Sequence, residues 1–245
     1  RKLRVSGLIQ KNIKMELTNT HRRYLGLEPV APEWERVEIP SNAVKSEPPV
    51  GKDILFFDGD VLRKVIWQYG NGYFREESYR LMTQDDRTMI APLTAKGRPK
   101  RLNGVNIQRC RPHGVYFSYS GDVLIANYTT QQTYYFSDFA GVPRIEPSEL
   151  PEFLNKWVAE TTDKDMDEIR AFAAAKRRRY KYSEGDIFRF RYDRRHYGYG
   201  QIIFDVQKFV NNGGKFWSIL MGKALCVAVY HIVTENPDVS IETLN

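Results

Sequence analysis

Apolar and polar positions alternate through much of residues 53–147, and short turn-forming sequences separate the alternating runs. Val115, Phe117 and Tyr119 alternate with Tyr116 and Ser118, which is the two-residue period of a strand with one buried face. The strand-like runs are ILFF, VLRKVIWQY, YFREESYRLMT, MIAPL, GVYFSYS, DVLIANYTT and TYYFS. Asp58-Gly59, Asn71-Gly72 and Ser120-Gly121 lie between runs, and such pairs tolerate the positive φ of hairpin turns. The pattern predicts an antiparallel β region over residues 53–147, with one helical turn after the basic loop KGRPKR.

A different period marks residues 148–179. The first predicted helix follows a capping Ser148, and its apolar stripe consists of Leu150, Phe153, Leu154, Trp157 and Val158. The second, from Asp163 to Arg179, carries its stripe on Met166, Ile169, Phe172 and Ala173. Acidic residues open this helix and Lys176–Arg179 close it, an order that complements the helix dipole. We therefore expect a pair of helices that face a core, and we interpret Lys176–Arg179 as stabilising a helix end.

The N-terminal part of the chain predicts little regular structure. Thr18 or Asn19 can cap a short helix that runs to Tyr24, and Gly26 is placed to end it. Five prolines follow within residues 29–49, where WERVEI (34–39) is the one strand-like run. We expect residues 15–52 to form an N-terminal helix and an extended arm outside the core.

Residues 180–245 predict a second β-rich domain. GDIFRFRY, HYGYGQIIF and KALCVAVYHIV are strand-like, with turns at Asp193–Arg195 and Asn211–Gly214. The apolar run Ala224–Val233 has about half the length that a membrane-spanning helix needs, so we interpret it as a buried strand. The whole chain therefore predicts an α+β fold with two mainly antiparallel β regions joined by a helical pair.

The formal net charge of the chain says less about its partners than its value suggests. The formal net charge is +7, but residues 1–14, which resemble an extension or tag before Met15, contribute five basic residues and no acid, so the remainder carries 7 − 5 = +2. Basic residues dominate residues 96–111 and 176–200, whereas residues 146–170 hold eight acids and three bases. Such blocks are solvated faces or set the orientation of a partner. The two cysteines, Cys110 and Cys226, form no metal or disulfide motif, which fits a reducing cytoplasm.

No catalytic, metal-binding or cofactor site is predicted. The four histidines, His21, His113, His196 and His231, are scattered and lie in no metal-ligand motif. Asp58 and Asp60 flank a glycine and could hold a cation, but DGD between apolar runs is first a hairpin turn. A phosphotriesterase-like hydrolase would need paired histidines and a bridging lysine on repeating βα units, and we keep it only as a third interpretation.

The stretch GDIFRFRYDRRHYGYG concentrates arginines and aromatic rings, which are residue types that dominate protein interfaces. We predict that its partner-binding residues are Arg189, Arg191, Arg194, Arg195, Tyr197 and Tyr199. The same side chains could pair phosphates and stack bases, so a nucleic-acid-binding or regulatory module is the second interpretation. Without any binding role, Arg189 and Arg191 would only mark the solvated face of a half-buried sheet. Gly198 and Gly200 alternate with Tyr197 and Tyr199, which predicts one aromatic face and one bare face open to another backbone.

The C-terminal residues also resemble a known family. Gly185, Asp186, Phe188 and the Tyr197-Gly198-Tyr199-Gly200 segment, followed by LMGKALCVAVYHIV, are similar to the bacterial immunity protein 26 family. Longer members look similar back to MELTNTHRRYLGL. The resemblance implies a cytoplasmic antitoxin, encoded beside a polymorphic or contact-dependent toxin, that binds the toxin and blocks it without catalysis. From the charge pattern we expect a toxin contact that is mixed or acidic, or a basic toxin site that meets residues 146–170.

Overall fold

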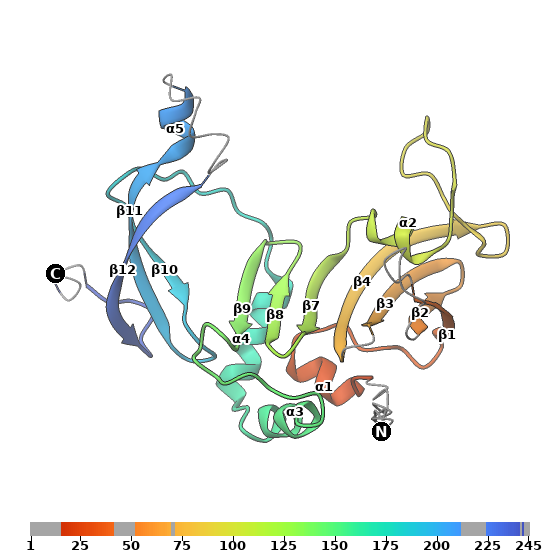
Figure 1. The fold of residues 1–245 in the computed structure, drawn as a ribbon, viewed down its shortest axis with the longest axis horizontal. Coiled ribbons are helices and arrows are strands. Elements are labelled where there is room, and N and C mark those ends of the chain that lie inside the picture. The colour runs from red at the N-terminus through yellow and green to blue at the C-terminus, as the bar shows by residue number, and fades with distance from the viewer. Residues whose placement is uncertain (1–15, 42–51, 70–71, 212–223, 241, 243–245) are drawn as a thin grey trace, which may run out of the picture.

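The α+β prediction is confirmed by a computed structural model that describes residues 16–41, 52–69, 72–211, 224–240 and 242. These residues form a nine-stranded and a three-stranded sheet, both antiparallel, together with helices. Figure 1 shows the two sheets as separate arms, with α1, α3 and α4 near the base that joins them. The predicted extension (1–14), the end of the predicted arm (42–51), Asn71 of the predicted turn and residues 212–214 lie outside the described residues.

The N-terminal segment is more than an arm. Helix α1 (Asn19–Tyr24) is capped by Thr18, whose side chain accepts from the His21 N–H, and Gly26 follows the helix with a φ of +75°. Strand β1 (Glu35–Pro40) pairs with the edge of the large sheet. Leu17, Leu25 and Leu27 are buried in the main core cluster. The leucines around α1 supply apolar area that the sheet needs, so the start of this segment is part of the main core.

The large sheet follows the predicted hairpins closely. Its main strands run in the order β1-β2-β3-β4-β7-β8-β9. Their bounds are β2 (Lys52–Asp58), β3 (Val61–Tyr69), β4 (Tyr73–Gln84), β7 (His113–Tyr119), β8 (Val123–Asn127) and β9 (Gln132–Phe136). Short strands β5 (Met89–Ile90) and β6 (Lys100–Arg101) and helix α2 (Gly104–Gln108) extend beyond β4. Val115, Phe117 and Tyr119 of β7 are buried as their alternation predicts.

Two core clusters stabilise the large sheet. The first includes Phe74, Phe117 and Ile125 together with residues of α3 (Leu150–Ala159) and α4 (Asp163–Ala174), so the helical pair packs on this sheet. The second is centred on Trp67 and Tyr79 and includes Ile107 of α2.

The ends of the two helices correct two predictions. Ser148 is not the cap of α3, because Glu149 occupies that position without a side-chain capping bond. Helix α4 ends at Ala174, and Ala175 has the extended ψ of 143°. Lys176–Arg179 therefore do not stabilise a helix end. Beyond Ala175 the chain offers consecutive like charges in place of an apolar stripe, and like charges repel one another along a helix.

A buried ion cluster ties α1 to the large sheet. The Glu76 carboxylate on β4 accepts hydrogen bonds from Lys64 Nζ at 2.6 Å and from Arg22 Nε at 2.8 Å. The Lys64 and Glu76 side chains are 0% exposed. Burial alone would raise the pKa of Glu76, but the charges of Lys64 and Arg22 outweigh it and lower that pKa. If α1 moved away from the sheet, the buried charges of Glu76 and Arg22 would lose their partners, which is costly. The cluster therefore fixes the position of α1.

The small sheet contains β10 (Ile187–Arg191), β11 (Tyr197–Asp205) and β12 (Leu225–Thr234), in that order. Helix α5 (Val206–Asn211), which the sequence analysis did not predict, follows β11. Strand β12 confirms the strand predicted over 224–233, but its predicted burial is wrong. Val227, Val229 and Val233 are 44%, 56% and 49% exposed, so their face of the sheet is not covered by a second layer among the described residues. No described helix is long and apolar enough to cross a membrane.

Gly198 and Gly200 make room for two phenyl rings. An added Cβ would lie 2.5 Å from the Phe190 ring at Gly198 and 2.6 Å from the Phe188 ring at Gly200. The glycine face is therefore covered by rings of the neighbouring strand, not bare as the sequence predicts. A close backbone is present at Gly200, where the added Cβ would lie 2.7 Å from the carbonyl oxygen of Ala228.

We expect Gly198→Ala to lower the free energy of unfolding by about 1–3 kcal/mol, because the methyl group overlaps the Phe190 ring. Urea unfolding of Gly198→Ala, Phe190→Leu and the double variant measures the coupling. The double variant should lose less stability than the two single losses added together. Strict additivity would contradict the proposed overlap.

Candidate partner-binding surface

The small sheet has two chemically different faces. Phe188 is opposite Gly200 and Phe190 is opposite Gly198, whereas Arg189 and Arg191 are opposite Tyr199 and Tyr197. Residues directly opposite one another in an antiparallel pair share a face of the sheet. One face therefore presents phenylalanines over glycines, and the other presents arginines and tyrosines.

The arginine–tyrosine face is covered in part by the chain that follows β12. The Tyr199 hydroxyl donates to the carbonyl oxygens of Asn236 at 2.9 Å and of Pro237 at 3.1 Å. Arg189 donates to the same Pro237 oxygen, and its guanidinium lies 5.1 Å from the Tyr197 ring centroid. These contacts bury Tyr199 almost completely and leave Arg189 partly exposed.

Arg191 reaches from the small sheet to the large one. Its guanidinium donates to Glu168 of α4 at 2.9 Å and to the Tyr197 hydroxyl at 2.9 Å. The same group lies 4.5 Å from the ring centroid of Tyr134 on β9. Burial raises the pKa of Tyr134 to about 12 despite the nearby Arg191, so its hydroxyl stays protonated at neutral pH.

Arg194 and Arg195 fix the β10–β11 turn against the helical pair. The Arg194 guanidinium lies 4.2 Å from the Trp157 ring centroid and donates to the Trp157 carbonyl and the Thr161 hydroxyl. Arg195 donates to the Asp165 carboxylate at 2.7 Å through Nη2. Asp193 shapes the turn by accepting from the N–H groups of Arg195 and His196, each at 2.8 Å.

Asp165 is the acidic centre of this junction. Burial would raise its pKa, but hydrogen bonds from Arg195 and from the N–H and hydroxyl of Thr162 outweigh burial and hold the pKa well below its usual range. The folded state therefore favours the carboxylate form of Asp165.

All six predicted partner-binding residues thus have contacts within the chain. The structure brings Arg189, Arg191, Tyr197 and Tyr199 onto one face and places Arg194 and Arg195 in the adjoining turn. Their contact with a partner stays a prediction. The solvated-face reading describes Arg191 poorly, because its side chain is largely buried.

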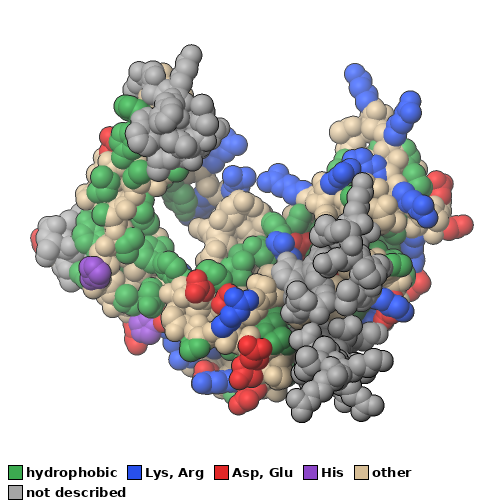
Figure 2. Space-filling model, in the orientation of Figure 1, with side chains coloured by type: hydrophobic (Ala, Val, Ile, Leu, Met, Phe, Trp, Pro, Cys, Tyr) green, Lys and Arg blue, Asp and Glu red, His purple; other side chains and the backbone are tan. Residues whose placement is uncertain are grey.

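The opposite face is the larger apolar surface of this unit. Val229 is opposite Gly200, Val233 is opposite Gly198, and Val227 is opposite Ile202, so these valines share the face of the phenyl rings. Phe139, which is 50% exposed, extends this face through a ring contact with Phe190 at 5.6 Å. We call Phe139, Phe188, Phe190, Val227, Val229 and Val233 the Phe–Val face. Figure 2 shows hydrophobic side chains along this arm.

Sequence reasoning missed the Phe–Val face because it took the β12 run as buried. A run of consecutive apolar residues gives the same signal whether or not a second layer covers it. The alternation of Val227, Val229 and His231 with smaller or ring-bearing neighbours is too weak to reveal the exposed face.

The described histidines do not share a common set of partners. His21 contacts Asn155, His196 contacts Asp193, and burial lowers the pKa of His113. Among the described residues, no group of three or more His, Cys, Asp or Glu side chains is arranged to hold a metal ion.

We expect Arg194→Ala to lower the free energy of unfolding by about 1–3 kcal/mol, because it removes charge-assisted hydrogen bonds at a mostly buried site. Arg194→Lys should restore only part of this loss, since an ammonium group lacks the planar guanidinium that stacks on Trp157. Chemical denaturation of both variants beside Arg179→Ala, which removes an exposed arginine, provides the comparison. Equal losses at positions 194 and 179 would contradict this role.

The lowered pKa of Asp165 predicts a dependence of stability on pH. Its contribution is complete above the unfolded pKa of about 4 and is lost as the pH falls through the lower folded pKa. We expect Asp165→Asn to be less stable than the wild type at neutral pH, with the difference shrinking below about pH 4. Urea unfolding at a series of pH values measures this, with the exposed Asp167→Asn as control. A difference between wild type and Asp165→Asn that does not change with pH would contradict it.

Comparison with known proteins gives one match. The sequence profile of the family described as Immunity protein 26 matches residues 183–245, which include all three strands of the small sheet. No curated protein and no solved structure matches the chain. The match covers 63 of the 245 residues. The family resemblance seen in the sequence is thereby confirmed for the C-terminal unit, whose residues 183–245 match the Immunity protein 26 family.

Proposed function

We propose that this protein is an immunity protein that binds a cognate bacterial toxin and neutralises it by a stoichiometric protein–protein interaction. The family match supports an immunity role in general. The toxin, the stoichiometry and action in the cytoplasm of the producing cell are our proposal. We assign no reaction and no cofactor to the chain.

The observation that carries the proposal is the exposed Phe–Val face. It lies mostly in the part of the chain that matches the family, and its three valines and Phe139 are about half exposed. Apolar side chains that gather on an exposed face, with polar residues around them, are typical of protein-interaction sites. Burial of this face by a toxin would supply the apolar centre of an interface, in which a few residues provide most of the affinity.

The predicted arginine and tyrosine set takes two roles in this proposal. Arg189 and Arg195 keep 43% and 47% of their side chains exposed, so they are accessible to a partner. Arg191, Arg194 and Tyr199 are largely buried, and we propose that they position the small sheet from within. Tyr197, half-buried between Arg189 and Arg191, links the two groups.

The test uses the purified toxin domain encoded beside the gene of this protein. We expect a one-to-one complex in size-exclusion chromatography with light scattering, and loss of toxicity when both are co-expressed. Val229→Asp should weaken the affinity by about tenfold or more, since it places a charge at the centre of the apolar contact.

Met82→Asp is the matched control, because Met82 is 54% exposed on β4 of the large sheet, outside the Phe–Val face. It should leave the affinity unchanged. Absence of any complex between the wild-type protein and the toxin would refute the proposed function. Equal affinities of Val229→Asp and wild type would remove the Phe–Val face from the interface.

A further inference from the structure

The segment between the two sheets is unusually basic, and the described residues make no hydrogen bond or ion pair with it. Residues 176–182, KRRRYKY, hold five cations and two tyrosines, and every one of these residues is exposed. We call residues 176–182 the basic segment. Tyr180 is 69% and Tyr182 44% exposed.

Elsewhere in the protein, arginines at structural junctions are paired. Arg22 contacts Glu76, Arg191 contacts Glu168, and Arg195 contacts Asp165. A run of unpaired cations makes the local electrostatic potential strongly positive, and the neighbouring cations repel one another. No contact among the described residues uses these cations to stabilise the fold. They are therefore accessible to a partner of opposite charge.

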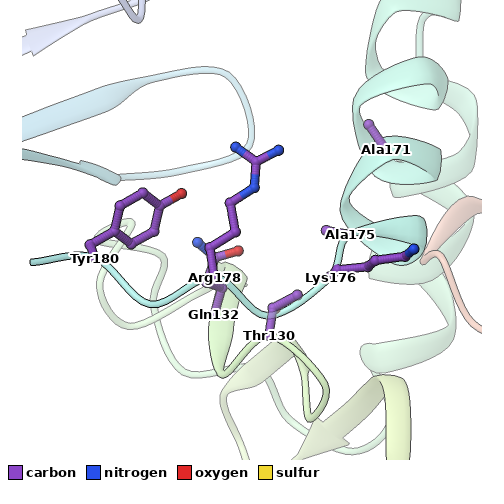
Figure 3. A pocket seen from close by; sticks show the side chains of 7 residues that line it. All are labelled: Thr130, Gln132, Ala171, Ala175, Lys176, Arg178 and Tyr180. Carbon is purple, nitrogen blue, oxygen red and sulfur yellow. The ribbon is translucent and has the colours of Figure 1, made fainter.

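A pocket beside the segment offers hydrogen-bond donors. It has a volume of about 310 Å³ and is lined by Thr130, Gln132, Ala171, Ala175, Lys176, Arg178 and Tyr180. Figure 3 shows these side chains around the space between the end of α4, the β8–β9 turn and the segment. The lining includes two cations, two hydroxyls and an amide but no acidic residue, a composition that favours an anionic group such as a carboxylate.

The basic segment lies beside the open space between the two arms. It runs from the end of α4 toward β10, and therefore connects the base to the small sheet (Figure 1). Figure 2 shows a hollow between the two arms with Lys and Arg side chains beside it.

We propose that the basic segment contacts an acidic surface of the toxin and steers the toxin into this hollow. This inference rests on the proposed function. Local charge complementarity of this kind raises association rates more than it raises affinity. The exposed tyrosines add aromatic area of the type found at protein interfaces.

An acidic protein fits these observations better than a nucleic acid does. Residues 146–170, which include α3 and α4 just before the segment, carry eight acids against three bases and would repel a long polyanion. An acidic patch on a protein is confined in extent, so it can occupy the basic segment without extending over those acids. Five adjacent cations and one pocket match such a patch.

The test reverses the charge of the segment with the triple variant Arg177→Glu, Arg178→Glu and Arg179→Glu. Binding of the purified toxin domain encoded beside the gene is followed by stopped-flow at low and high ionic strength. We expect the association rate constant at low ionic strength to fall by about tenfold or more, and the difference to shrink at high ionic strength because salt screens exposed charges. Melting curves check that the variant folds.

The control variant makes the same change of net charge at another site, with Lys156→Glu, Lys164→Glu and Arg170→Glu on α3 and α4. If the basic segment steers the toxin, this control should change the rate constant much less. An equal fall in both variants would mean that only total charge matters, and would overturn the inference.

The remaining outcomes separate this inference from the proposed function. A toxin complex that forms at the wild-type rate in the segment variant overturns the inference and leaves the function intact. No complex with the wild type overturns both. A single-stranded oligonucleotide is titrated beside a polyglutamate peptide of equal length. Tighter binding of the oligonucleotide, lost in the segment variant, would assign the segment to nucleic acid instead.

Discussion

The carboxylate of Asp165 determines how the two sheets are held together. It accepts from the N–H and hydroxyl of Thr162, which caps α4, and it also accepts from Arg195 in the β10–β11 turn. Because α4 packs into the main core through Ile169, a turn bound to Asp165 is fixed relative to the large sheet. A largely buried carboxylate is costly unless it is paired, so the helix start and the junction between the sheets stabilise each other.

This junction divides the charged and aromatic residues of the C-terminal half into two groups. Arg191, Arg194 and Tyr199 make hydrogen bonds within the chain and are largely buried. The Phe–Val face and the basic segment have little that covers or pairs them among the described residues. An inhibitor that works by binding needs a rigid framework and exposed contact groups. The buried residues provide the framework, and the Phe–Val face and the basic segment provide the contact groups. The apolar face would provide affinity and the basic segment the rate of encounter.

Most of the fold was predictable because its signals are local. The two-residue alternation of β7, the turn residues between the strands and the apolar stripes of α3 and α4 each depend on near neighbours in the sequence. Helix α1 and its Thr18 cap follow from the same kind of signal. What local signals could not reveal is contact between residues far apart in sequence, such as the pairing of Arg22 with Glu76, which binds α1 to the sheet.

The sequence by itself determined the α+β class, hairpins of the large sheet, the helical pair and the resemblance of the C-terminal unit to the Immunity protein 26 family. It also singled out the arginine- and tyrosine-rich stretch, but residue type cannot tell an arginine that pairs with Asp165 from one that faces solvent. Tertiary structure decided that rings of β10 fill the space over Gly198 and Gly200, and that β12 is exposed. The physical reason is common to both: local period fixes which side chains share a face, whereas only the packing of segments against one another decides whether anything covers that face.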